Sequence, residues 1–224
     1  KNVDRIVTIS NSMKKTLIND YKINKNKIVL IENWHTSYFK KKTLIKNDKI
    51  NIFYNGNISL VHDEVFAIDF INQIKNKDLN FKIFTNSQKV KNKFSKKLLN
   101  IGFLSKNLFH KYLLKSDFQM IFSKPGALKY VYPSKIYNIL YSKKPIIYFN
   151  KSDNDEIARF LDKYQIGINI NYKNKKKFIN LFSDTEKIKS LIKLYKSSYE
   201  KLSFLKLRKN ISITKWKDVI KCVE

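Results

Sequence analysis

The sequence predicts an α/β protein built on a doubly wound parallel sheet. From Ile50 onward, short segments rich in β-branched and aromatic residues alternate with segments in which apolar residues recur at intervals of three and four. The connections between the two kinds of segment are short, as in strands joined by helical crossovers. Because such crossovers are right-handed, we expect helices on both faces of one sheet. With 224 residues and 43% hydrophobic content, the chain can bury one substantial core.

A separate pair of strands is expected before this sheet. Residues 5–9 form a short apolar run, and Ser10 or Ser12 after it is suited to cap a helix. Residues 27–31 predict a second strand. The lysine-rich stretch 40–49 then separates these elements from the main alternation.

The main alternation contains five clear strands, at residues 50–54, 81–85, 118–122, 145–149 and 166–170. A weaker strand is expected at residues 99–103. The intervening helices are marked by apolar residues at helical spacing, namely Ala67, Ile71 and Ile74, then Leu108, Tyr112 and Leu113, then Ile136, Ile139 and Leu140, then Ile157, Phe160 and Leu161. The rest of the chain is predicted to be helical, and its last helix carries an apolar stripe of Trp216, Val219, Ile220 and Val223.

The segment 130–149 joins a loop, a short helix and a strand. Pro133 fixes its own φ, so Ser134 and Lys135 are expected to open the helix. Free backbone N–H groups and the positive end of the helix dipole would meet a hydroxyl and an ammonium group there, which indicates a site for a phosphate. The alternative is a helix that these two residues merely cap, and the segment by itself supports both interpretations about equally.

Ligands of parallel α/β sheets bind outside the carboxyl ends of the strands. Gly56 and Asn57 follow the first strand of the sheet, where a glycine lets the backbone approach a ligand. One glycine falls far short of a dinucleotide-binding fingerprint. The loop after residue 122, which contains Lys124 and Gly126, is expected to face the same crevice.

The run PSKIYNIL at residues 133–140, followed by Lys144-Pro145-Ile146-Ile147, resembles the donor-binding segment of GT-B-fold glycosyltransferases, especially those of family 4. The resemblance extends over nearly the whole chain. It implies the Rossmann-like C-terminal half of a GT-B fold with C-terminal helices, in which this helix holds the ribose and diphosphate of a UDP- or GDP-linked sugar. No cofactor beyond this substrate is implied.

The resemblance also implies a set of donor-binding residues. Phe103 and Leu104 would lie beside the nucleobase, and the loop after residue 122 would bind the sugar. A pair of glutamates common in the family is replaced by Tyr130 and Asn138, of which only the asparagine can still bond ribose hydroxyls. The full expected set is Gly56, Asn57, Phe103, Leu104, Lys124, Gly126, Tyr132, Pro133, Ser134, Lys135 and Asn138.

The sequence assigns no catalytic residue and no metal site. His35, His62 and His110 are too dispersed for a metal triad. Retaining transferases of the type that the chain resembles are thought to rely on the donor phosphate and positioned backbone. Stabilisation of the leaving diphosphate is therefore expected from Lys135, Ser134 and the helix start.

By the same resemblance, the chain divides into four parts. Residues 1–34 would be the remnant of an N-terminal acceptor-side domain, and residues 35–49 an interdomain linker. Residues 50–207 would form the nucleotide-sugar-binding Rossmann-like domain, and residues 208–224 a helix that crosses back to the N-terminal side. The chain begins at Lys1 rather than at a methionine, so we expect a piece of a longer protein or a processed chain.

The net charge of +28 would attract nucleic acid, anionic lipid or phosphorylated ligands. However, the basic residues are almost all lysines scattered along the chain, without a nucleic-acid-binding module. A solvated basic surface is therefore favoured over a dedicated polyanion site. No specific nucleic-acid partner is expected, and peripheral contact with an anionic membrane stays open. The sequence contains a single cysteine, Cys222, and no run that resembles a signal peptide or a membrane span. These features fit a cytoplasmic protein. Contact with anionic lipid would place it at the inner face of the membrane.

The function expected from the resemblance is that of a hexosyltransferase. It would move a sugar from a nucleotide sugar to a glycan or lipid-linked acceptor in surface polysaccharide biosynthesis, with retention of configuration. One alternative is a non-catalytic nucleotide-sugar-binding subunit that needs a separate chain with the acceptor domain. Another is a sugar-nucleotide epimerase on the same fold, which would need carboxylates and histidines in the crevice.

Overall fold

The computed structural model of the chain describes residues 3–34, 48–86, 99–102, 104–152, 155–202 and 204–221. Its main feature is a six-stranded sheet in the order β5-β4-β3-β6-β7-β8, with every neighbouring pair parallel. The predicted doubly wound parallel sheet is therefore confirmed. Its strands are β3 (Ile50–Asn55), β4 (Leu79–Thr85), β5 (Leu99–Ile101), β6 (Phe118–Ser123), β7 (Ile146–Asn150) and β8 (Gly167–Ile170).

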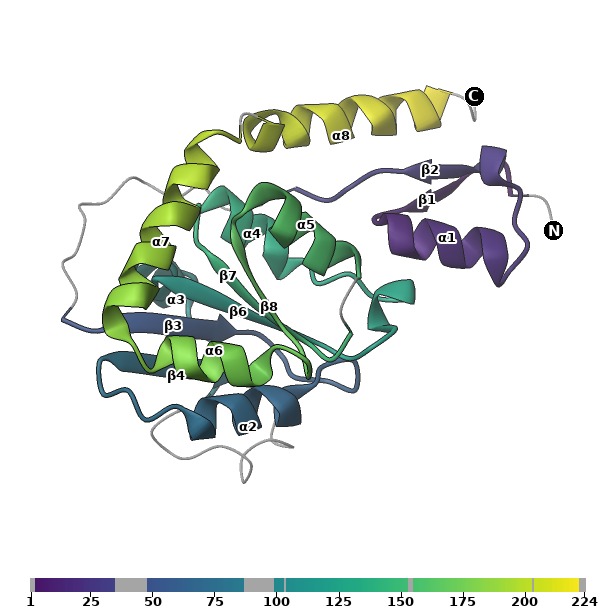
Figure 1. The fold of residues 1–224 in the computed structure, drawn as a ribbon. Helices are drawn as coiled ribbons and strands as arrows, with labels where there is room; N and C mark the ends of the chain where they lie inside the picture. The colour runs from purple at the N-terminus through teal and green to yellow at the C-terminus, as the bar shows by residue number, and fades with distance from the viewer. Residues whose placement is uncertain are drawn as a thin grey trace.

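Helices cover both faces of this sheet (Figure 1). Side chains alternate along each strand, so Ile52 and Tyr54 join the core under α2, α6 and α7. Phe53 points to the opposite face, where its ring stacks on Tyr112 of α3. The helices are α2 (Glu64–Gln73), α3 (Lys106–Lys115), α4 (Lys135–Tyr141), α5 (Glu156–Tyr164), α6 (Lys175–Phe182) and α7 (Thr185–Glu200).

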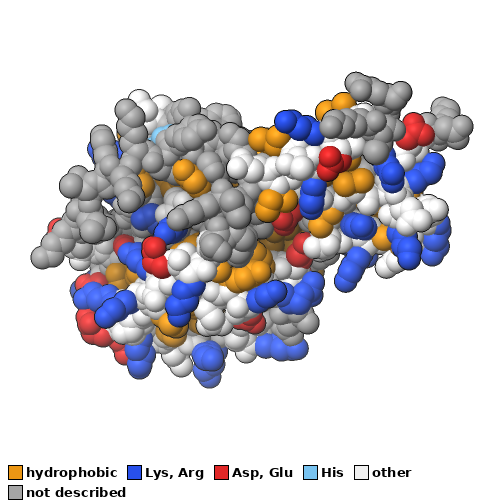
Figure 2. Space-filling view, turned by 90° about the horizontal axis from the view of Figure 1, so that it is seen from above, with side chains coloured by type: hydrophobic (Ala, Val, Ile, Leu, Met, Phe, Trp, Pro, Cys, Tyr) orange, Lys and Arg blue, Asp and Glu red, His pale blue; other side chains and the backbone are white. Residues whose placement is uncertain are grey.

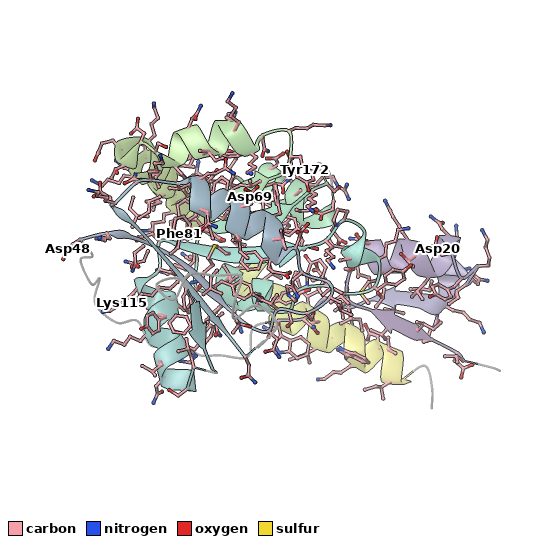
Figure 3. The ribbon with its side chains drawn as sticks, turned by 90° about the horizontal axis from the view of Figure 1, so that it is seen from below. Asp20, Asp48, Asp69, Phe81, Lys115 and Tyr172 are labelled. Carbon is pink, nitrogen blue, oxygen red and sulfur yellow. The ribbon has the colours of Figure 1, made fainter. Side chains whose placement is uncertain are left out.

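Polar contacts fix the positions of these helices at the surface of the core. Asp69 of α2, labelled in Figure 3, pairs with the ammonium group of Lys175 at the start of α6. On the other face, the Lys144 ammonium group donates to the carbonyl oxygens of Leu114 and Ser116, at 2.7 and 2.8 Å. These carbonyls lie at the C-terminal end of α3, where no further helical turn can satisfy them. The lysine thus ties α3 to the segment between α4 and β7.

The expected strand pair before the sheet is present as a separate two-stranded parallel sheet. It docks on the main domain through Glu156 of α5, whose carboxylate accepts the backbone N–H groups of Asn11 and Ser12 at 3.0 and 2.8 Å. A carboxylate at a helix N-terminus also meets the positive end of the helix dipole. Ser10, rather than Ser12, caps this helix. The elements are β1 (Ile6–Thr8), α1 (Asn11–Asn19), η1 (Lys25–Lys27) and β2 (Ile28–Leu30).

The last helix, α8 (Phe204–Lys221), runs from α7 across α4 toward β2 (Figure 1). Among the residues of α8 whose burial is described, Ser212 is buried, and its Oγ donates to the backbone oxygen of Glu32 at 2.6 Å. Of the predicted apolar stripe, Trp216 and Ile220 are 40% and 57% exposed, whereas Val219 is half-buried. Val223, the last member of the stripe, lies outside the described residues.

Lysine and arginine side chains are spread over the visible face of the molecule, with acidic side chains between them (Figure 2). Among the helices of the described ranges, none is both long enough and apolar enough to cross a membrane.

Gly167 marks a point where strands β7 and β8 approach too closely for a side chain. A Cβ atom at this position would lie 2.4 Å from the backbone oxygen of Ile146. We expect Gly167→Ala to lower the free energy of unfolding by about 1–3 kcal/mol, because the clash involves backbone that cannot rotate away. Urea denaturation measures the effect, with Asn169→Ala on the same strand as the control. An unchanged midpoint for Gly167→Ala would contradict the packing described.

Candidate functional site

A cavity of about 730 Å³ opens beside the carboxyl end of β3, next to the point where the order of the sheet reverses. Such a switch point is where open α/β sheets bind ligands. The wall combines the segment after β2, the loop after β3, helix α3, strand β6 and the predicted segment around α4. It consists of Asn33, Trp34, Asn55, Gly56, Asn57, His62, Phe109, Gln119, Val131, Tyr132, Pro133, Ser134, Lys135, Tyr137, Asn138 and Ile139.

Lys135 places a cation in this wall without a hydrogen-bonding partner. Its Nζ atom is buried and makes no hydrogen bond within the described residues, although part of the rest of the residue remains accessible. Nζ lies over the ring of Tyr54, 3.7 Å from its centroid. A ring face attracts an ammonium group but does not replace the hydrogen bonds that water would give it. Burial accordingly lowers the pKa of Lys135 to about 7.

A nearly uncompensated cation in a cavity is suited to receive an anion. A phosphate group would restore the lost hydrogen bonds and would stabilise the charged form of Lys135. The apolar stripe of α4 faces the core, since Ile136, Ile139 and Leu140 are buried, and Lys135 lines the cavity.

Gly56 makes room for this lysine. Its φ of +148° is rare for residues with a side chain, and a Cβ atom there would lie 2.6 Å from Lys135 Nζ. The sequence indicated only that the backbone could approach a ligand at this glycine. The structure shows a second reason for it, which is the close passage of the Lys135 side chain.

Replacing Gly56 is therefore expected to disturb both the loop and the cation. We expect Gly56→Ala to lower the free energy of unfolding by about 1–3 kcal/mol through backbone strain. Anion binding in the cavity should weaken as well, because Nζ must move. Gly126→Ala is the matched control: it also changes a glycine with positive φ, +76°, but its Cβ would meet no atom within 4 Å. Equal anion binding by both variants would contradict the proposed contact between Gly56 and the cation.

His62 lies in the same wall, in the loop between β3 and α2. Burial, and next the charge of Lys135, lower the pKa of His62 to about 4, so the ring is neutral at physiological pH. The neighbouring Asp63 has a structural role. Its carboxylate accepts the N–H of Phe66 at the start of α2 and pairs with the Lys151 ammonium group at 3.0 Å.

Seven of the predicted donor-binding residues line the cavity together, namely Gly56, Asn57, Tyr132, Pro133, Ser134, Lys135 and Asn138. Leu104, Lys124 and Gly126 lie outside its wall. The loop after β6 turns away into the short helix η3 (Ala127–Lys129), which contacts α1. Phe103 lies outside the described residues. Donor-binding roles for all eleven residues stay predictions.

The start of α4 differs from the expected anion site in one respect. The N–H groups of Ile136 and Tyr137 already donate to the backbone oxygens of Pro133 and Ser134, at 3.1 and 3.2 Å. These two amides are used in the turn that begins the helix. Ser134 is exposed, and its side chain makes no capping hydrogen bond to α4, which was the alternative role considered for it. The positive charge of the site therefore comes from Lys135.

Other residues of the wall were not predicted from the sequence. Asn33 and Trp34 reach the cavity because Glu156 docks the β1–β2 unit on α5. Gln119 is buried and donates to Ser116 Oγ at 2.7 Å. Gln119 could have been identified from the sequence as a candidate site residue, because it is a polar residue inside an otherwise apolar strand. Within the described ranges, no three side chains of His, Cys, Asp or Glu come close enough together to hold a metal ion.

The sheet order and the cavity at the switch point define the class of fold. Comparison with solved structures shows that the chain has the Rossmann-like fold of the C-terminal half of GT-B glycosyltransferases. No family model matches the chain, and no curated protein matches its sequence.

Three solved structures illustrate the similarity. A mutant of TarM from Staphylococcus aureus, in complex with fondaparinux, α-GlcNAc-glycerol and UDP, is 12% identical with a TM-score of 0.69, and the match covers 96% of this chain. WaaG, a glycosyltransferase involved in lipopolysaccharide biosynthesis, is 5% identical with a TM-score of 0.66 over 92% of this chain. A glycosyltransferase from Rickettsia africae is 17% identical with a TM-score of 0.60 over 97% of this chain. The chain spans 43%, 61% and 64% of the lengths of these three proteins.

Proposed function

We propose that this chain forms the donor-binding half of a glycosyltransferase that uses a nucleotide sugar, UDP- or GDP-linked, as its donor. The observation that carries the proposal is the buried ammonium group of Lys135, which faces a cavity at the switch point of the sheet without a hydrogen-bonding partner in the described ranges. The diphosphate of a nucleotide sugar supplies the anionic oxygens that this group lacks. The fold, shared with TarM and WaaG, supports the proposal.

The proposed reaction needs stabilisation of negative charge. When the bond between the anomeric carbon and the diphosphate oxygen breaks, the electron pair stays on the diphosphate. The acceptor oxygen bonds to the sugar, and its proton passes to the departing diphosphate. Lys135 would stabilise the developing charge, with the Ser134 hydroxyl group as a further donor. Asn138, one helical turn further along α4, would bond the ribose hydroxyls. Retention of configuration, a metal-free mechanism and membership of family 4 are parts of the proposal.

The acceptor and the setting are proposed by analogy. WaaG is involved in lipopolysaccharide biosynthesis, and the TarM structure contains α-GlcNAc-glycerol. These names favour a hexosyltransferase that acts on a glycan or lipid-linked acceptor in surface polysaccharide biosynthesis. We place the protein in the cytoplasm, at the inner face of the membrane, where its net charge of +28 would favour anionic lipid.

The cavity favours transfer over epimerisation, because no aspartate or glutamate belongs to its described wall. An epimerase on this fold would need such groups. A nucleotide-sugar-binding subunit that needs a separate acceptor-domain chain is the second candidate.

Calorimetric titration with UDP, GDP and CDP, and then with the sugars of the nucleotide that binds, tests the proposal. We expect one nucleoside diphosphate to bind with micromolar affinity and to raise the melting temperature. Slow hydrolysis of the bound nucleotide sugar by this chain would favour a transferase, whereas binding without turnover would favour a subunit. If none of the nucleotides binds, the proposed function is wrong.

A further inference from the structure

The Ser59–His62 turn holds an imidazole ring in the wall of the cavity. The backbone N–H of Ser59 donates to Nδ1 of His62 at 3.0 Å, and Ser59 Oγ lies 3.1 Å from the same nitrogen. The backbone N–H of His62 donates in return to the Ser59 carbonyl oxygen at 3.0 Å. The ring is thus fixed by its own turn, in a cavity wall that also contains Gly56 and Lys135.

These contacts determine which ring nitrogen carries the proton. A backbone N–H can only donate, so Nδ1 must accept, and in the neutral ring the proton lies on Nε2. Burial, followed by the charge of Lys135, keeps the pKa of His62 far below neutrality. Lys124 acts in the same direction, whereas the charge of Glu64 opposes it. The ring therefore stays a neutral donor in the presence of the neighbouring ammonium group.

We propose that His62 binds the diphosphate of the donor nucleotide as a neutral hydrogen-bond donor, through Nε2–H, while Lys135 supplies the positive charge. Nε2 has no hydrogen-bonding partner within the described ranges, and the ring belongs to the cavity wall. A second cation beside Lys135 would raise the free-energy cost of burying charge. A neutral donor adds a hydrogen bond to the diphosphate without that cost. Ser59 is the positioning residue, since it selects the tautomer. The inference rests on the proposed function.

Two amide variants separate the two ring nitrogens. The longer side chain of H62Q can place an N–H donor where Nε2 stands, whereas that of H62N reaches only the position of Nδ1. We expect H62N and H62A to bind the nucleoside diphosphate about tenfold more weakly than the wild type, as for the loss of one hydrogen bond to a charged oxygen. H62Q should stay within about threefold of the wild type. If His62 had only a structural role, variants with equal melting temperatures would not differ in nucleotide affinity in this order.

Titration of UDP, GDP and CDP into each variant, with thermal melts as the folding control, gives the affinities. Long-range ¹H–¹⁵N spectra of the histidine rings should show His62 protonated at Nε2 and not titrating between pH 5 and 8. S59A keeps the backbone donor and should keep this tautomer. If the wild type binds a nucleotide and H62A binds it equally well, or H62Q is as weak as H62A, this inference is overturned while the proposed function stands. Failure of the wild type to bind any nucleotide overturns both.

Discussion

Lys135→Met is expected to weaken the binding of nucleoside diphosphates by roughly ten- to a hundredfold, because one charge-assisted contact to a phosphate is worth about 1.5–3 kcal/mol. The same substitution should stabilise the free protein. The wild-type ammonium group is buried against the Tyr54 ring without a hydrogen bond among the described residues. A thioether of similar length keeps the contact with the ring and removes the cost of burying the cation. We expect the free energy of unfolding to rise by about 1 kcal/mol.

Lys144→Met is the matched control. Burial lowers the pKa of Lys144 to about 8, so it is a second buried lysine, but its ammonium group is bonded to two carbonyl oxygens at the end of α3. Its removal leaves those oxygens unpaired, which should cost about 1–3 kcal/mol of stability. Because Lys144 is not part of the cavity wall, nucleotide affinity should not change.

Urea denaturation and calorimetric titration of the two variants measure both quantities. The two variants are expected to change the free energy of unfolding in opposite directions. A general effect of removing a buried lysine would change it in the same direction in both. Lys135→Ala should lose affinity in the same way but without the gain in stability, because it leaves a cavity beside Tyr54. Nucleotide binding by Lys135→Met at wild-type affinity would contradict the assignment of Lys135 to the phosphate site.

Nucleotide-sugar affinity is expected to fall as the pH rises above about 7, by up to tenfold per pH unit. Burial lowers the pKa of Lys135 to about 7 in the free protein, and a bound diphosphate favours the protonated form and raises that pKa. Below pH 7 the lysine is already charged, so the affinity is constant there. Between the free and the bound pKa values, each binding event must take up a proton, and the affinity declines with increasing pH.

The same pKa shift affects stability with a defined sign. In the unfolded chain Lys135 keeps its proton up to about pH 10. Between pH 7 and about 10 the unfolded state therefore binds more protons than the folded state, so the contribution of Lys135 to the free energy of unfolding rises with pH. Tyr54 does not interfere, because burial raises the pKa of its phenol group above its ordinary value.

Titrations with a nucleotide sugar at pH 6.5 and 8.5 test this dependence, because its diphosphate has no group that titrates in this range. Repeating them in buffers with different ionisation enthalpies counts the protons taken up. Lys135→Arg is the control, since arginine stays charged and should remove the pH dependence even if the fit is poorer. His62 is neutral in the free protein over this range, because its pKa is lowered to about 4. Constant affinity and no proton uptake in the wild type would refute the assignment.

The sequence predicted the sheet because the signals for its strands are local. Residues 50–54, 118–122 and 145–149 are short apolar runs bounded by turns, and the structure places strands there with ends that differ by one residue. The parallel arrangement followed from the alternation with helices. The prediction was weakest for α8, because an apolar stripe shows which face a helix can bury and not whether the fold covers that face. Trp216 and Ile220 are exposed in the structure.

For the candidate site, the sequence by itself determined the segment around α4, because Pro133, Ser134 and Lys135 are adjacent and their spacing to the apolar stripe is set by helical geometry. Only the tertiary structure brought Gly56, from the loop after β3 and 79 residues earlier, against Lys135, and placed His62 in the same cavity wall. It also decided the protonation of the site. The pKa of a lysine depends on burial and on the charges around it, and those arise when β3, the following loop and α4 meet at the end of the sheet.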